Sequence, residues 1–143
     1  MSPRAAGPKA TKKLPPPRTG ILVIGHGSRA TEAVKVLADV VASLRRRFRG
    51  FVVEPCFLEL NQPDIQTAID RAVGQGAGRI LFVPFSTYLD GHVGRDLPEH
   101  IVMARERHPG LDIRIARHLG PDPRLVAICS DRIRKGLRDG RWA

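Results

Sequence analysis

Short apolar runs alternate with longer stretches of helical spacing from Gly20 onwards. The runs are rich in leucine and β-branched residues, which favour strands, and a polar, glycine-containing or proline-containing turn follows each one. After each turn, apolar residues recur in steps of three and four, which is the spacing of an amphipathic helix. The predicted strands lie at residues 21–24, 51–53 with 57–58, 80–83 and 113–116.

Four helices are predicted after these strands. The first runs from Thr31 to three arginines at 45–47, because cations are favoured at a helix C-terminus. The second is predicted to begin at Pro63 and the third at Pro98, since proline is favoured in the first turn of a helix. The fourth follows a Gly-Pro-Asp-Pro turn at residues 120–123. Its expected apolar face consists of Leu125, Ile128, Ile133 and Leu137.

This alternation of strands and helices predicts an α/β fold in three layers. Right-handed crossovers between parallel strands return each helix over the sheet, so we expect helices on both faces of a roughly four-stranded parallel sheet. A chain of 143 residues, 42% of them hydrophobic, suits one domain with one core, which we place at residues 20–143. Ligands of such folds bind where the carboxyl ends of the strands meet.

The first 19 residues differ from the rest of the chain. The formal net charge is +10, and half of it lies in this stretch, which has five cations and no acidic residue. Five prolines and few apolar residues predict a disordered tail, because such a stretch cannot bury enough surface to fold. A basic arm can contact nucleic acid or anionic lipid, but no aromatic residue interleaves its charges, so we favour a solvated tail.

Membrane insertion and secretion are not expected from this sequence. No stretch reaches the roughly 18 consecutive apolar residues that a membrane span needs. The N-terminus also lacks the apolar centre of a signal peptide, so we expect a cytoplasmic protein. Cys56 and Cys129 are too few and too far apart for a disulfide framework or a zinc-ribbon spacing, so both are expected to be buried thiols.

The most informative motif follows the first predicted strand, at Gly25-His26-Gly27-Ser28-Arg29. An imidazole binds borderline metals and titrates near neutrality, and flanking glycines let backbone and ligand approach closely. In the alternative interpretation the glycines only end the strand, and the histidine is solvated. A nucleotide-binding loop is disfavoured, because a third glycine and a Gly-Lys-Ser/Thr sequence are missing.

Two more candidate ligands follow other predicted strands. Glu59 comes after the second strand and His92 after the third, so both are candidates for the same edge of the sheet as His26. Two imidazoles and a carboxylate with an open position suit a divalent metal that is held loosely and then released. Both candidates have simpler alternatives. Glu59 is then a solvated or helix-capping carboxylate. Asp96, four residues after His92, then caps a helix and does not orient the His92 imidazole.

Other polar residues near these histidines are candidates for the rim of a pocket. Arg29 and Arg95 each lie three residues after a candidate histidine, and guanidinium groups suit a ligand rich in carboxylates. Tyr88 precedes His92 and either lines a pocket or packs its own loop.

Taken together, these segments resemble the small CbiX/SirB type of class II chelatase, a family that inserts a divalent metal into sirohydrochlorin. The resemblance covers residues 20–137, in the order of the family and at about its spacing, and excludes the tail. The matching segments are Gly25-His26-Gly27-Ser28-Arg29, Phe57-Leu58-Glu59-Leu60 with Pro63, Val83-Pro84, and His92-Val93 with Arg95-Asp96-Leu97-Pro98.

The resemblance implies a sheet of order 2-1-3-4, as in flavodoxin-like folds, and a homodimer. It implies that His26 and His92 are the metal-binding and catalytic imidazoles, with Glu59 as an acidic helper. The substrate carries eight carboxylates, which the net charge of +5 outside the tail attracts. The residues expected to bind this substrate are Ser28, Arg29, Tyr88 and Arg95.

The activity implied by the resemblance is that of a lyase-class metal chelatase in cobalamin or siroheme biosynthesis. Cobalt is the expected metal. Iron and nickel stay open as alternatives, because ligand type separates the first-row metals less than geometry and supply do. The metal is a substrate, and no organic cofactor is expected.

The chain departs from the family pattern between residues 86 and 91. Ser86 and Thr87 replace an apolar Phe-Leu pair, and Asp90 stands where the family has a glycine, with Gly91 after it. The loop before His92 is therefore more polar, which leaves the metal preference open. In one interpretation Asp90 is an additional metal ligand. In the other, the glycine of the family has shifted by one position to Gly91 and the turn is kept.

Two functions of other classes also fit the sequence. A non-catalytic carrier of metal or tetrapyrrole would use the same pocket as the chelatase. A nucleic-acid-associated module would use the tail and a basic cluster near the C-terminus, although we favour a solvated helix face for that cluster. The cluster consists of Arg132, Arg134, Lys135, Arg138 and Arg141.

Overall fold

The computed structural model describes residues 17–89, 91–139 and 142, without the side chains of His92 and Val93. Four parallel strands form one sheet in the order β2-β1-β3-β4, which confirms the predicted α/β fold and strand order. The elements are β1 (Arg18–Gly25), α1 (Thr31–Arg47), β2 (Val52–Phe57), α2 (Ile65–Gly74), β3 (Ala77–Pro84), α3 (Gly91–Arg107), β4 (Asp112–Ile115) and α4 (Pro123–Asp139).

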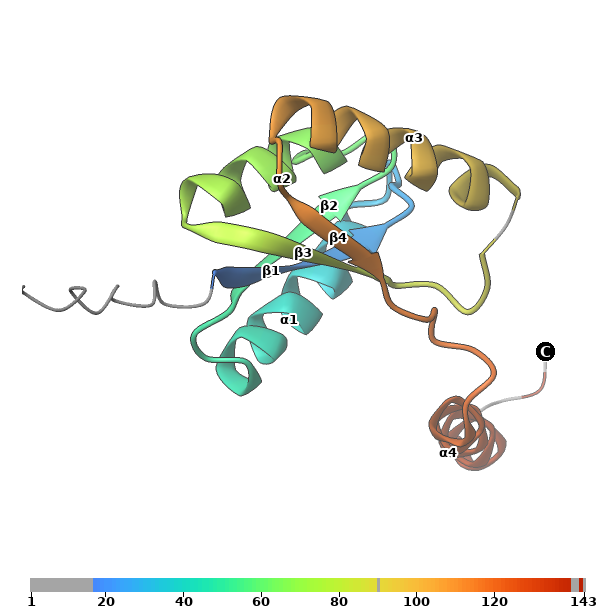
Figure 1. Ribbon diagram of the computed structural model, residues 1–143. Coiled ribbons are helices and arrows are strands. Elements are labelled where there is room, and N and C mark those ends of the chain that lie inside the picture. The colour runs from blue at the N-terminus through green and yellow to red at the C-terminus, as the bar shows by residue number, and fades with distance from the viewer. Residues whose placement is uncertain (1–16, 90, 140–141, 143) are drawn as a thin grey trace, which may run out of the picture.

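Helices lie on both faces of the sheet, as Figure 1 shows, with α1 on one side and α2 and α3 on the other. Successive strand residues point to opposite faces, so β1 supplies both cores. Its Ile21 and Val23 pack with Leu37 and Val41 of α1. Leu22 belongs to the larger cluster under α2 and α3.

The first strand begins earlier than the sequence predicts. The boundary was expected before Gly20, but β1 begins at Arg18, whose Nη1 donates to the carbonyl of Gln75 at 3.1 Å. Residues 1–16 of the expected tail lie outside the described residues. Among the residues that the structure describes, no helix is long and apolar enough to cross a membrane.

Helix α2 begins at Ile65 rather than at Pro63, because Asp64 supplies its N-cap. The Asp64 carboxylate accepts a hydrogen bond from the backbone N–H of Thr67 at 2.8 Å. This bond satisfies one of the free amides of the first turn, and it lowers the pKa of Asp64 below its ordinary value. Pro63 instead lies in the preceding turn, where its carbonyl accepts from Phe57 N at 3.0 Å.

Helix α3 begins at Gly91, so the prediction that it begins at Pro98 is wrong. Proline inside a helix removes one backbone hydrogen bond, here the one to the carbonyl of Gly94. Gly94 is exposed, so water can replace that bond. The earlier start places His92 and Arg95 in the first turns of a helix instead of in a loop.

Helix α4 does not pack against the sheet, contrary to the expectation for its apolar face. None of its residues is buried, and in Figure 1 the helix lies apart from the sheet. The connection from β4 is held elsewhere, because the backbone N–H of Leu119 donates to the carbonyl of Ser86 at 2.8 Å. Gly120 packs so closely on Thr87 that an added Cβ would lie 2.4 Å from the Thr87 carbonyl oxygen. The start of α4 is thus held beside the β3–α3 loop.

The two cysteines have different environments. Cys56 is fully buried, as expected, and burial raises the pKa of its thiol to about 12. Cys129 is exposed, which contradicts the expectation of two buried thiols. The cause is the exposure of α4, to which Cys129 belongs.

Candidate active site

His26 and Glu59 meet at the carboxyl edge of the sheet. His26 directly follows β1, and Glu59 comes two residues after β2. These strands are neighbours, paired in register with Gly25 opposite Phe57, so the residues that follow them are brought together. The Nε2 atom of His26 lies 3.1 Å from Oε1 of Glu59, and both side chains are more than half exposed, at 56% and 58%.

The backbone of the two loops fixes this pair. The N–H of Glu59 donates to the carbonyl of His26 at 3.1 Å, and the N–H of Leu58 donates to the carbonyl of Gly25 at the same distance. Gly27 has a φ of +110°, and a Cβ at this position would lie 1.9 Å from the carbonyl oxygen of Glu59. Glycine is therefore required between His26 and Ser28, since a larger residue would push the loops apart.

Asn61 is a further link between the loops that no motif in the sequence predicted. Its Oδ1 accepts from the backbone N–H of Ser28 at 2.7 Å, while its own N–H donates to the carbonyl of Glu59 at 2.7 Å. Leu60, between them, has a φ of +65°. The signal available in the sequence was the turn composition Asn-Gln-Pro directly after the Glu59 segment.

His26 stands between two hollows of the surface. One has a volume of about 440 Å³ and is lined, besides His26, by Ile24, Leu58, Pro84, Ser86, Thr87 and Tyr88. The other, of about 320 Å³, is more apolar, and its side chains include Val34, Val36, Leu37, Phe57 and Phe85. A mostly apolar wall with a few convergent polar groups is typical of a small-molecule site.

The donor set of this pair suits transient metal binding. An imidazole nitrogen and a carboxylate oxygen are ligands for divalent first-row metals, and two protein ligands leave most coordination positions open. Within residues 17–89, 91–139 and 142, no group of three or more His, Cys, Asp or Glu side chains converges on one point. The pair of His26 and Glu59 by itself has the donors for loose metal binding.

The other expected site residues lie around the same edge. The Ser28 hydroxyl accepts from Ala30 N at 3.0 Å, and Arg29 is exposed beside it. Tyr88 is 66% exposed and lines the larger hollow, where its carbonyl accepts from the Ser86 hydroxyl at 2.8 Å. Arg95 is exposed near the start of α3.

His92 is the second residue of α3, directly after the β3–α3 loop whose Ser86 to Tyr88 line the larger hollow. Its side chain and the whole of Asp90 lie outside the described residues. The expected roles of these two residues therefore stay predictions.

The remaining histidines take part in contacts of the fold. His100 Nδ1 lies 3.2 Å from Nε2 of Gln66, and His108 Nε2 lies 2.7 Å from Oδ1 of Asp70. His118 Nδ1 accepts from the N–H of Gly120 at 3.3 Å.

Comparison with known proteins identifies the family. The CbiX family model matches residues 20–136. The sirohydrochlorin ferrochelatase of Bacillus subtilis is 32% identical over 117 residues, which are 82% of this chain and 45% of the relative. The sirohydrochlorin cobaltochelatase of Sulfurisphaera tokodaii is 33% identical over 119 residues, which are 83% of this chain and 94% of the relative.

A solved structure gives the same result. The sirohydrochlorin chelatase SirB from Bacillus subtilis subspecies spizizenii, in complex with cobalt, is 32% identical and superposes with a TM-score of 0.77. The match covers 82% of this chain and 50% of that one, and the chain spans about half the length of the ferrochelatases it matches, between 42% and 52%. The fold, the matched span of residues 20–136 and these identities together show that the chain belongs to the CbiX family.

Proposed function

We propose that this protein is a sirohydrochlorin chelatase, which inserts a divalent metal into the tetrapyrrole. The observation that carries the proposal is the pair of His26 and Glu59, 3.1 Å apart between two hollows, in a chain of the CbiX family. Relatives similar over four fifths of this chain are named sirohydrochlorin ferrochelatases and cobaltochelatases.

Insertion replaces two pyrrole protons of the ring by one divalent cation. The site must therefore deliver the cation and accept protons, and a neutral imidazole can do both. His26 holds the metal through Nε2, with the Glu59 carboxylate as a second ligand beside it. After transfer of the metal to the ring nitrogens, these two groups are free to take up the released protons. His92, in the first turn of α3, is the proposed second imidazole.

The rim of the site has the charge that the substrate requires. Arg29 and Arg95 are exposed at the edge where the strands end, and each offers a guanidinium to a carboxylate of the ring. Tyr88 and Ser28 add hydroxyl groups beside the hollows. The apolar wall of Ile24, Leu58 and Pro84 suits the face of the macrocycle.

Cobalt is the proposed metal, with iron and nickel as alternatives, in cobalamin or siroheme biosynthesis. Both ferrochelatases and cobaltochelatases are among the similar proteins, and SirB was solved with cobalt. The proposed assembly is a homodimer.

The test follows the absorbance of sirohydrochlorin with the full chain and Co²⁺, Fe²⁺ or Ni²⁺. The expected result is insertion faster than the uncatalysed rate with at least one metal, and fastest with cobalt. Equal rates with and without protein for all three metals would overturn the proposal. Stoichiometric binding without turnover would instead support a non-catalytic carrier.

A variant of His92 tests the second imidazole. His92→Ala is expected to abolish insertion, because one of the two metal-transfer and proton-accepting groups is lost. The matched control is His100→Ala on the same helix, since His100 contacts Gln66 rather than either hollow. Full activity of His92→Ala would remove this residue from the mechanism.

A further inference from the structure

The loop after β2 turns back on itself directly after Glu59. The backbone N–H of Asn61 donates to the carbonyl of Glu59 at 2.7 Å, which closes a three-residue turn around Leu60. Leu60 has a φ of +65°, in the left-handed region that residues other than glycine rarely adopt. A three-residue turn with a positive φ at its centre is strained, so contacts outside the turn have to hold it in place.

The side chain of Asn61 supplies such a contact. Its Oδ1 accepts from the backbone N–H of Ser28 at 2.7 Å, and the two residues are 33 positions apart in the chain. Ser28 follows Gly27, whose backbone already lies tightly against the carbonyl of Glu59. Asn61 therefore connects the strained turn after Glu59 to the turn after His26.

The side chains of His26 and Glu59 are not held by packing. Both are more than half exposed, and within the described residues Glu59 forms an ion pair with His26 alone. An exposed glutamate side chain moves between rotamers, and fixing it in one of them costs conformational entropy. The distance of 3.1 Å between Nε2 and Oε1 therefore depends on how the two backbone segments beneath these side chains are placed.

We propose that Asn61 is a positioning residue of the metal site. Its bond to Ser28 keeps the backbone segments of His26 and Glu59 at the separation at which both side chains hold one divalent cation. Two donors that are already in place bind a cation more tightly than two donors that binding has to bring together, because less conformational freedom is lost. Asn61 lines neither hollow, so it acts through these residues. The inference rests on the proposed function, because it concerns the same site.

The first experiment measures the affinity of the full chain for Co²⁺ by calorimetry, without tetrapyrrole. Asn61→Ala removes the acceptor of the Ser28 amide and is expected to weaken Co²⁺ binding about 10-fold, as the loss of a residue that supports a metal ligand does. Asn61→Asp keeps an acceptor oxygen at the same place, so it is expected to bind Co²⁺ at least as tightly as wild type. Equal affinities of Asn61→Ala and wild type would overturn the inference.

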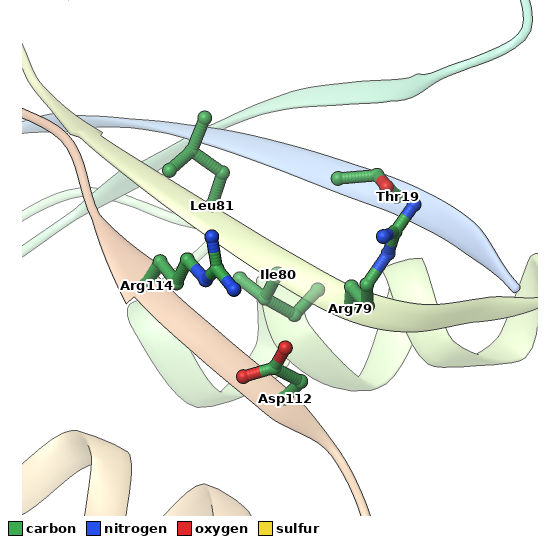
Figure 2. A pocket seen from close by; sticks show the side chains of 6 residues that line it. All are labelled: Thr19, Arg79, Ile80, Leu81, Asp112 and Arg114. Atoms are coloured by element: carbon green, nitrogen blue, oxygen red, sulfur yellow. The ribbon is translucent and has the colours of Figure 1, made fainter.

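Cobalt bound elsewhere on the chain has to be separated from this measurement. A further hollow, of about 290 Å³, lies at the opposite end of the sheet, where β3 and β4 begin (Figure 2). The one carboxylate among its described lining residues, Asp112, shares the hollow with the guanidinium groups of Arg79 and Arg114, which repel a cation. This hollow is therefore not expected to compete for Co²⁺, and His26→Ala measures any binding that remains at other places.

The matched control is Asp64→Ala, three residues further along the same segment. It removes a bond of the same kind, from the backbone N–H of Thr67 to a side-chain oxygen at 2.8 Å, but this bond belongs to the start of α2. Urea unfolding is expected to show a similar loss of stability for Asp64→Ala and Asn61→Ala, whereas only Asn61→Ala loses Co²⁺ affinity. Equal losses of affinity in the two variants would mean that general loosening of the segment, rather than positioning by Asn61, weakens the site.

The second experiment needs neither metal nor tetrapyrrole. The backbone N–H of Glu59 donates to the carbonyl of His26, so its protection from hydrogen exchange reports whether the two loops stay together. Faster exchange of this amide is expected in Asn61→Ala, and wild-type exchange in Asn61→Asp and Asp64→Ala. Unchanged protection in Asn61→Ala would contradict the inference.

The results separate this inference from the proposed function. A wild type that binds Co²⁺ without inserting it would overturn the chelatase activity and leave the role of Asn61 in metal binding. A wild type that inserts the metal, with Asn61→Ala equal to it in affinity and exchange, would overturn the role of Asn61 alone. A wild type that does not bind Co²⁺ would overturn both.

Discussion

Two histidine–carboxylate pairs of similar length lie in different parts of the molecule. Nε2 of His26 is 3.1 Å from Oε1 of Glu59, and Nε2 of His108 is 2.7 Å from Oδ1 of Asp70. The first pair joins two loops at the carboxyl edge of the sheet. The second joins α2 to the end of α3, just before β4 begins. The chemical groups are the same, so the difference in role has to come from their surroundings.

The pair of His108 and Asp70 is closed by a third charge. Asp70 also forms an ion pair with Arg107, and the His108 side chain is only 24% exposed. With both carboxylate oxygens engaged, this cluster connects two helices and has little capacity for a ligand. The His26 side chain is 56% exposed between two hollows, and Glu59 has no other ion pair within the described residues. Open coordination, rather than a short distance, therefore distinguishes a candidate site from a structural contact.

Among variants of the two pairs, the largest effect is expected for His26→Ala. Loss of the imidazole that holds metal and accepts a proton is expected to lower the rate of insertion by at least about 100-fold. The free energy of unfolding is expected to change by less than about 0.5 kcal/mol, because the side chain is exposed. Insertion followed by absorbance and thermal unfolding followed by circular dichroism check the two parts. Wild-type insertion activity in His26→Ala would mean that the pair of His26 and Glu59, like the pair of His108 and Asp70, has no role in insertion.

A smaller loss is expected for Glu59→Gln. The amide keeps the size of the side chain and one oxygen, but it removes the charge beside Nε2 of His26. Such neighbours of a metal-binding imidazole contribute about 10- to 100-fold in metal affinity or activity. The affinity for Co²⁺ measured by calorimetry, together with the insertion rate, checks this expectation. The control is Glu54→Gln, a half-buried carboxylate in β2 that pairs with Arg45 away from the hollows, and unchanged cobalt binding is expected for it. Equal cobalt affinities for Glu59→Gln and wild type would exclude Glu59 as a ligand.

His108→Ala is expected to give the opposite pattern. Asp70 keeps Arg107 as a partner, so the cost is that of one hydrogen bond, about 1 kcal/mol of the free energy of unfolding. Insertion is expected to stay within twofold of wild type, because neither hollow at His26 includes this residue. Urea unfolding and the insertion assay on the same preparation check both parts. A variant of full stability and reduced activity would mean that the second pair is the functional one.

The sequence predicted those parts of the molecule that depend on local pattern. Alternating apolar runs and helical stretches were enough for the sheet, and the motif after β1 identified His26. The pairing of β1 with β2 then brings Glu59 to His26, and the family resemblance had already connected these two residues. The bond from Ser28 to Asn61 was missed because it joins residues 33 positions apart, and only the register of the strands brings them together.

The position of α4 apart from the sheet was also beyond the sequence. An amphipathic pattern predicts that a helix buries one face, but it does not say against which surface. The decisive contacts are Leu119 with Ser86 and Gly120 with Thr87, which connect two loops and leave no periodic signal. Pro98 misled the prediction of α3 for a related reason, because an exposed Gly94 lets the helix continue through a proline.

The smallest effect is expected for Asp64→Asn, at a third carboxylate, which caps α2 and belongs to neither pair. Asparagine also caps helices well, so the variant keeps the bond to Thr67 and loses only a charge at the start of α2, worth about 0.5 kcal/mol at neutral pH. The capping bonds hold the pKa of Asp64 below its ordinary value of 3.8, so this contribution is present above that pH and disappears as the pH falls through the lower pKa of the folded state. Urea unfolding of both proteins at a series of pH values is expected to show the difference shrinking in acid, with insertion unaffected at neutral pH. A difference that is constant with pH would mean that the carboxylate acts at α2 through packing rather than charge.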